Sequence, residues 1–241
     1  MLLCWRSLNV DNFLLEVDHI FVCTTKDAAN NSVLQELGFH CSEQRIQRVE
    51  QGTASRAIFF ENTYLELIWV ENEHAFKRQY DYTGIHTPAR FEWQHTGASP
   101  FGIGLRYKSQ TAKSPLPFTQ RSIKSMRPDL SVRFANNNLA SLSEPICFVL
   151  PNSIALTAWL DCSLSAHQQL ISHPLNVNKL TGVKVTVNSD RSLSHAISLL
   201  CLHEIITIER GTSPLLELTF DTQMRGKILD ARPILPILFR Y

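Results

Sequence analysis

A strand followed by a helix and then further strands is predicted twice along the chain. Near the N-terminus, an apolar, β-branched stretch over residues 15–24 predicts a strand, and helical spacing over 26–37 predicts a helix that ends before Gly38. After an extended polar stretch, strands are predicted over 56–60 and 64–70. Such a repeat constrains the fold strongly, because each curled sheet needs a neighbour to close its core.

The C-terminal third repeats this order. It contains predicted strands over 180–187, 205–209 and 215–220 and a predicted helix over 192–203. A last extended segment over 227–239 contains two prolines and suits an edge strand or a wrapping tail. Four more strands are predicted between the two units, over 101–107, 121–126, 145–150 and 154–161. Their helix is missing or degraded, since 108–117 is rich in Ser, Lys and Pro.

The sequence therefore predicts an α+β fold of repeated βαβββ modules that form curved mixed or antiparallel sheets around a cleft. We expect four parts along the chain: an N-terminal extension over 1–15, a first module with its connecting loop over 16–97, a helix-poor middle module over 98–178, and a C-terminal module with a tail over 179–241.

Composition excludes several classes of function. Lys plus Arg is 23 against 22 for Asp plus Glu, so no global charge favours nucleic acid or a membrane surface. The six cysteines are scattered without a CxxC pair, which favours free thiols in a reducing compartment. With no signal-peptide pattern, we expect a cytoplasmic protein that binds a small molecule and has no nucleic-acid or membrane partner.

Three motifs carry a resemblance to a known family: Val-Asp-His-Ile at 17–20, Gln-Gly-Thr-Ala-Ser-Arg at 51–56, and Tyr-Leu-Glu-Leu at 64–67. Together they resemble the glyoxalase-like branch of the vicinal oxygen chelate superfamily, most strongly over 16–71. The resemblance implies paired βαβββ modules around a cleft that often holds a divalent metal. Members include lyases, isomerases, dioxygenases, epimerases and metal-free drug-binding proteins, so the fold does not settle the function.

The resemblance also implies two metal ligands. His19 matches the family's histidine ligand and Glu66 its carboxylate ligand, and Glu66 is therefore also a candidate catalytic residue. A divalent Zn, Mn, Ni or Fe ion held there would act as a Lewis acid or, as iron, activate dioxygen. No nucleotide cofactor is expected, because no Walker loop or complete GxGxxG is present. The alternative is that Asp18, His19 and Glu66 are polar residues at a sheet edge or lining a cleft, hydrogen-bonded to the backbone and to each other.

The second half of such a metal site departs from the family pattern. Glycines stand where a ligand is needed, at 102 or 104 in the middle module and at 182 in the last module. Glu217, in Leu-Glu-Leu at 216–218, echoes Glu66 and is the second candidate catalytic residue. By strand count the matching acid can instead be Asp230.

Three further residues are candidates for substrate binding. Arg56 and Arg106 lie in apolar strands, where a guanidinium needs a carboxylate of the protein or of a ligand. The alternative for both is a structural ion pair within the protein. Asn62 is either a ligand contact or the turn residue of a tight hairpin.

The leading interpretation is a glyoxalase-like protein that acts on a small oxygenated organic molecule. If it is an enzyme, the resemblance implies a metal-dependent lyase, isomerase or dioxygenase. The chief alternative is a metal-free protein of the same fold that binds or sequesters a small molecule. A third reading is an interaction module whose sheet edges pair with another chain or with a second copy as a homodimer.

Overall fold

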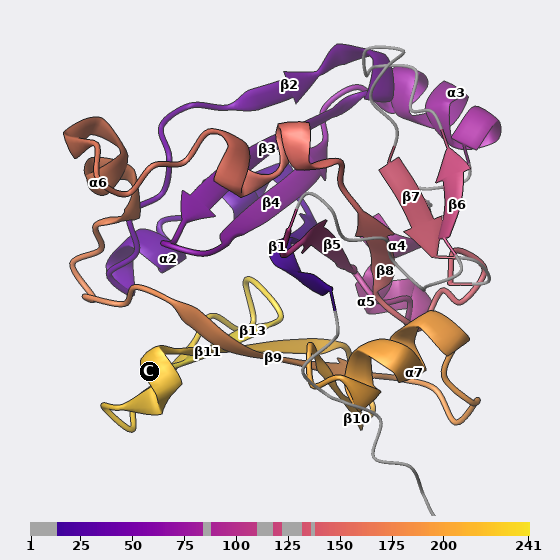
Figure 1. Ribbon diagram of the computed structural model, residues 1–241. Coiled ribbons are helices and arrows are strands. Elements are labelled where there is room, and N and C mark those ends of the chain that lie inside the picture. The colour runs from indigo at the N-terminus through magenta and orange to yellow at the C-terminus, as the bar shows by residue number, and fades with distance from the viewer. Residues whose placement is uncertain (1–13, 84–87, 110–117, 122–131, 136–137) are drawn as a thin grey trace, which may run out of the picture.

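Two curved mixed sheets make up the structure (Figure 1). This computed structural model describes residues 14–83, 88–109, 118–121, 132–135 and 138–241. The larger sheet has eight strands and the smaller has five. The predicted α+β fold with curved sheets is confirmed, whereas the boundaries of the four predicted parts stay predictions.

The eight-stranded sheet has the order β2-β3-β4-β1-β5-β8-β7-β6. Its strands are β1 (Leu15–Thr24), β2 (Ile46–Arg48), β3 (Thr53–Phe59), β4 (Tyr64–Val70), β5 (Phe101–Tyr107), β6 (Phe118–Arg121), β7 (Val132–Ala135) and β8 (Ile146–Val149). β1 pairs with β4 in parallel and with β5 in antiparallel orientation, and β5 pairs with β8 in parallel. The sheet thus consists of two four-stranded halves whose strand orders mirror each other about the β1–β5 pair.

The five-stranded sheet has the order β10-β9-β11-β13-β12. Its strands are β9 (Leu180–Val187), β10 (Thr207–Arg210), β11 (Leu215–Phe220), β12 (Ile228–Asp230) and β13 (Ile237–Arg240). Helix α7 (His195–Leu202) connects β9 to β10, which are parallel neighbours. This pairing differs from the halves of the larger sheet, in which the first strand pairs with the fourth.

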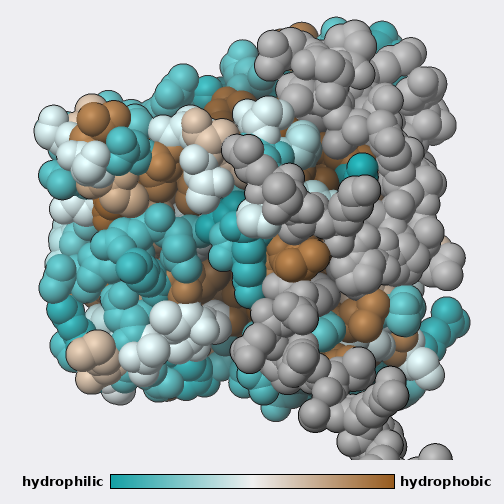
Figure 2. Space-filling view, viewed as in Figure 1, coloured by the Kyte–Doolittle hydropathy of each residue, from teal (hydrophilic) through white to brown (hydrophobic). Residues whose placement is uncertain are grey.

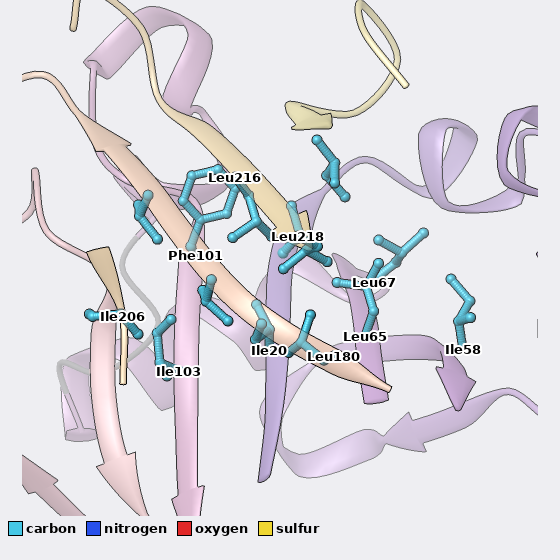
Figure 3. Close-up of a cluster of buried hydrophobic side chains, with 14 of the residues drawn as sticks. Ile20, Ile58, Leu65, Leu67, Phe101, Ile103, Leu180, Ile206, Leu216 and Leu218 are labelled. Atoms are coloured by element: carbon cyan, nitrogen blue, oxygen red, sulfur yellow. The ribbon is translucent and has the colours of Figure 1, made fainter. Parts of the chain in front are cut away.

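One apolar cluster fills the space between the two sheets. The larger sheet contributes, among others, Ile20, Val22, Leu65, Leu67, Phe101 and Ile103. The smaller sheet and α7 contribute, among others, Val183, Val185, Leu216, Leu218, Ala196 and Leu200. Figure 3 shows the side chains of both sheets meeting in this cluster. Each large apolar side chain buried there stabilises the fold by roughly 1.5–3 kcal/mol.

A β-bulge in β1 changes which residues face this cluster. The pairing of β1 with β5 shifts between Val17 and His19, so Asp18 has no partner on β5. Before the bulge the odd-numbered residues of β1 contact the cluster, and after it the even-numbered residues do. The bulge therefore lets Asp18 and His19 both point away from the second sheet, and it accounts for the polar pair that interrupts the apolar pattern.

The helices are short. They are α1 (Lys26–Asn30), α2 (Val33–Glu36), α3 (Glu73–Thr83), α4 (Pro88–Phe91), α5 (Trp93–Thr96) and α6 (Ser165–Ile171), with 3-10 turns η2 (Val49–Gln51), η3 (Asn152–Ile154), η4 (Leu156–Ala158) and η5 (Asp221–Gln223). The helix predicted over 26–37 is divided in two because the side chain of Asn31 accepts the Val33 N–H. Gly38 follows with φ of +91°, as its predicted capping role requires.

Two strand predictions in the middle of the chain differ from the structure. The strand predicted over 154–161 is wrong, because this stretch forms η4 and the Leu156 N–H donates to the carboxylate of Asp18 instead of to a strand. The strand predicted over 121–126 lies almost entirely outside the described residues, since β6 ends at Arg121. Strand β7 and helices α3, α4, α5 and α6 were not predicted.

Among the described residues, no helix has the length and apolarity needed to cross a bilayer. Among the residues coloured in Figure 2, hydrophobic side chains lie in several groups between hydrophilic ones.

His173 fastens the segment before β9 to the first half of the larger sheet. Its Nδ1 accepts a hydrogen bond from the His40 N–H, and its Nε2 donates to the Phe59 carbonyl, each at 2.9 Å. Burial lowers the pKa of this imidazole from 6.5 to about 4. His173 is therefore neutral at neutral pH, with its proton on Nε2.

We expect this histidine to make folding stability depend on pH between about 4 and 6.5. In that window the unfolded chain binds a proton that the folded chain does not, so stability falls as the pH falls, by up to about 3 kcal/mol. His173→Gln, whose amide can replace both hydrogen bonds, should lose this component. Urea unfolding across the window compares the two proteins, and identical pH profiles would contradict the assignment.

Candidate functional site

A cleft of about 170 Å³ lies on the side of the larger sheet that faces away from the second sheet. Its apolar lining is Phe21, Ile68, Val132, Phe148, Leu150 and Ile154, and its polar lining is His19, Arg48, Gln51, Thr53, Tyr64 and Glu66. These residues come from both halves of the sheet and from the turn after β8. The volume is below the 300–1,000 Å³ or so of typical ligand pockets, so the cleft suits a small molecule.

The imidazole of His19 is held in one orientation. It stacks on the Tyr64 ring with centroids 4.6 Å apart and meets the Phe148 ring edge to face at 5.4 Å. Its Nδ1 lies 3.0 Å from Asp18 Oδ1. Within the described part of the chain this is the only hydrogen bond of the ring, so Nε2 remains available to a molecule in the cleft.

Two glycines of β5 make room for the rings of β1. A Cβ atom added to Gly104 would lie 2.5 Å from His19 Cε1, and one added to Gly102 would lie 2.0 Å from Phe21 Cε1. Both distances are shorter than any real contact, so side chains at these positions would displace the rings. The residues that supply no metal ligand thus have a steric role in shaping the cleft.

Asp18 is fully buried behind His19. Its Oδ2 accepts the Leu156 N–H at 2.8 Å and lies 3.3 Å from Arg106 Nη1. Burial alone would raise the pKa of Asp18, but its hydrogen bonds to His19 and Leu156, together with the charge of Arg106, hold the pKa below its ordinary value. The carboxylate is therefore ionised at neutral pH.

Glu66 belongs to a closed triangle of side chains. Its Oε1 accepts hydrogen bonds from Arg48 Nη2 at 2.5 Å and from Ser55 Oγ at 2.6 Å. Arg48 Nη1 also donates to Ser55 Oγ at 2.9 Å. Burial opposes ionisation of Glu66, yet Arg48 and the Ser55 hydrogen bond keep its pKa below the ordinary value. Glu66 is an anion whose charge Arg48 already balances.

Arg106 and Asn62, both predicted to bind substrate, are engaged within the protein. Arg106 donates to Glu16 Oε1 at 2.7 Å and to the Asn62 carbonyl at 3.1 Å, besides its contact with Asp18. The Asn62 amide bridges to β9, donating to the Leu180 carbonyl and accepting the Leu180 N–H, each at 2.9 Å. Neither residue lines the cleft; both border a separate cavity of about 260 Å³.

The structure does not bring Arg56 to the cleft. Ala54 and Ile58, its neighbours at alternate positions of β3, belong to the cluster between the sheets. Arg56 therefore faces the side of the sheet opposite to the cleft, where its charge acts on Cys41. The sequence predicted that an arginine in this strand needs a partner for its charge. It could not predict which face of the sheet the side chain occupies.

Glu217 is also separated from Glu66. It lies on the face of the second sheet that points away from the apolar cluster, where it forms ion pairs with Lys184 and Arg240. Asp230, the alternative acid, is half exposed on β12 and pairs with the arginine two residues later. The site thus contains His19 and Glu66 from the predicted set but neither of the two further acids.

Sequence reasoning missed Arg48 and Ser55, the partners of Glu66, and Tyr64, which supports His19. Thr53 and Ser55 are polar residues at alternate positions of β3, and this pattern is the signal that one face of the strand borders a polar site. Arg48 could not be found this way, because its contact with Glu66 depends on the register between β2 and β3.

The donor set does not fit a metal centre of the kind the resemblance implies. The two halves of the sheet are related by a pseudo-symmetry that exchanges β1 and β5 about the Ile20–Ile103 pair. In the second half, Gly102 is therefore equivalent to His19, and Phe148 is equivalent to Glu66. Neither residue is a ligand, and one Glu66 oxygen is already bonded to Arg48 and Ser55. The described residues contain no group of three His, Cys, Asp or Glu side chains able to hold a metal.

The chain belongs to the glyoxalase-like domain family, because the model of that family matches residues 17–201. This confirms the resemblance seen in the three motifs and is consistent with the vicinal oxygen chelate superfamily. A solved structure of a hypothetical protein from Staphylococcus aureus is similar, with a TM-score of 0.55 and 13% identity over 94% of this chain and 98% of that one. At that identity the likeness shows the fold alone. No curated protein matches the chain.

Gly104→Ala should destabilise the protein by about 1–3 kcal/mol, because the new methyl group collides with the His19 ring. In a His19→Ala background the same change should cost clearly less, because the collision partner is gone. Urea unfolding of the wild type, both single variants and the double variant gives the coupling. Additive effects would show that His19 is not what Gly104 accommodates.

Arg48→Met should destabilise the protein by roughly 3 kcal/mol, since it leaves Glu66 buried without its cation. Adding Glu66→Gln should recover part of this loss because the buried charge is then removed. Arg240→Met is the matched control, because Glu217 keeps Lys184 as a partner and the loss should be smaller. Equal losses in the two arginine variants, measured by urea unfolding, would contradict the role given to Arg48.

Proposed function

We propose that this glyoxalase-like protein binds a small oxygenated organic molecule in the cleft of His19 and Glu66, without a resident divalent metal. The observation that carries the proposal is the way Glu66 is bonded. Arg48 and Ser55 occupy one of its oxygens and balance its charge, so little attraction remains for a cation.

The walls of the cleft support a partly apolar ligand. Phe21 and Phe148 come from opposite halves of the sheet, with ring centroids 6.1 Å apart, and Ile68 and Ile154 extend the apolar surface. His19 and Glu66 add the polar groups that would orient an oxygenated compound. An apolar pocket with few convergent polar groups is the usual form of a small-molecule site.

A larger hollow elsewhere supports a ligand less well. A pocket of about 400 Å³ lies between the loop before β8 and the loop before α7. Its buried acid, Glu144, already accepts hydrogen bonds from the Asn138 amide and the Ser194 N–H. The carboxylate of Glu144 is thus already used by the fold.

Binding can be tested by NMR titration with a panel of small alcohols, carbonyl compounds and carboxylic acids. At least one compound should bind, and Glu66→Gln should weaken that binding about tenfold or more, since an isosteric amide disturbs the Arg48 triangle. Glu217→Gln is the matched control, because Glu217 is an equally buried, doubly paired glutamate on the far side of the second sheet. Absence of binding, or equal weakening in both variants, would contradict the proposal.

Elemental analysis tests the absence of a resident metal. Purified protein, before and after incubation with Zn, Mn, Ni or Fe salts and desalting, should contain far less than one equivalent. A stoichiometric metal that is retained by the wild type and lost in His19→Ala and Glu66→Ala would establish the metal-dependent alternative instead.

A further inference from the structure

The contacts of Asp18 determine where His19 carries its proton. An ionised carboxylate has no hydrogen to donate, so the 3.0 Å contact between Asp18 Oδ1 and His19 Nδ1 requires the proton on Nδ1. In the neutral imidazole the lone pair then resides on Nε2, the nitrogen left for the cleft. The orientation is fixed as well, because the ring is confined by Tyr64, Phe148 and the glycine position at 104.

Two of the polar groups that line the cleft are acceptors when His19 is neutral, while Arg48, Gln51, Thr53 and Tyr64 also line it and carry N–H or O–H donors. His19 Nε2 presents a lone pair, and Glu66 is a carboxylate. A ligand that places an ether or carbonyl oxygen against Nε2 would set acceptor against acceptor, which leaves buried polar groups unpaired. A ligand with a hydroxyl group can donate to Nε2 and satisfy it.

We infer that Asp18 is a positioning residue that fixes His19 as a hydrogen-bond acceptor toward the cleft, and that the cleft takes a small hydroxyl compound with a flat apolar body. The inference rests on the proposed function for its ligand but not for the state of His19. The flat body follows from the aromatic rings of Phe21, Tyr64 and Phe148 around the site.

Asp18→Asn should change His19 Nε2 from a hydrogen-bond acceptor to a donor, with little change in the shape of the cleft. The Leu156 N–H and Arg106 both donate to the position of Oδ2, so the amide oxygen of asparagine must lie there. The amide NH2 group then faces His19 Nδ1, which becomes an acceptor. The imidazole proton moves to Nε2, and the cleft presents a donor.

The first measurement is the tautomer of His19 by two-bond 1H–15N NMR, without ligand, with signals assigned by their loss in His19→Gln. We expect the proton on Nδ1 in the wild type and on Nε2 in Asp18→Asn. Thr63→Val is the control, because it removes only the 3.0 Å hydrogen bond from Thr63 to the Asp18 carbonyl and should leave the tautomer unchanged. A wild type protonated on Nε2, or an unchanged tautomer in Asp18→Asn, would overturn the positioning role.

The second measurement compares phenol with anisole, which has a methyl group in place of the hydroxyl hydrogen. Phenol should bind the wild type about threefold to tenfold more tightly and shift the Nε2 signal of His19. In Asp18→Asn the preference should fall below about twofold, while Thr63→Val keeps it. Equal affinities in the wild type, or no binding of phenol, would overturn the ligand class. The proposed function is contradicted separately, when the whole panel fails to bind or when Glu66→Gln and Glu217→Gln weaken binding equally.

Discussion

The buried carboxylate of Asp18 connects parts of the molecule that are far apart in the sequence. It bonds to His19 in the cleft, to Leu156 in the turn after β8, and to Arg106 on β5. Arg106 in turn holds the carbonyl of Asn62, whose side chain is bonded to β9 in the second sheet. Burying a charge costs several kcal/mol unless it is well paired, so the loss of any one of these contacts leaves the buried carboxylate less well stabilised. The orientation of the cleft histidine therefore depends on the same interactions that join the two sheets.

The second sheet also decides which face of the larger sheet is free to bind a ligand. Apolar side chains at alternate positions of β1, β3 and β4 enter the cluster between the sheets, and the residues between them border the cleft. In a regular strand, His19 would point toward the apolar cluster, as Leu15 and Val17 do. The bulge at Asp18 turns His19 to the cleft side instead. Gly104 completes this arrangement, since any larger residue there would collide with the imidazole.

Much of the fold could be predicted from the sequence because alternation within a strand is a local signal. The bounds expected for residues 15–24, 64–70, 101–107, 180–187 and 215–220 agree with β1, β4, β5, β9 and β11. Contacts between distant segments could not be predicted. Glu66 and Glu217 occupy similar Leu-Glu-Leu motifs and both point away from the cluster between the sheets, so the packing of the two sheets places them in separate pockets on opposite sides of that cluster. The alternation after β8 predicted a strand, but this stretch forms 3-10 turns in which the Leu156 N–H donates to Asp18, a partner that is distant in the sequence.

The two faces of each strand of the larger sheet border different surroundings, the cleft on one side and the cluster between the sheets on the other. On β4, Tyr64, Glu66 and Ile68 line the cleft, whereas Leu65 and Leu67 pack in the cluster between the two sheets. Substitutions at 64 or 68 can alter the cleft without removing a side chain from the cluster between the sheets. A substitution of Asp18 has wider consequences, because its bond to Arg106 connects the cleft histidine, through Asn62, to β9 of the second sheet.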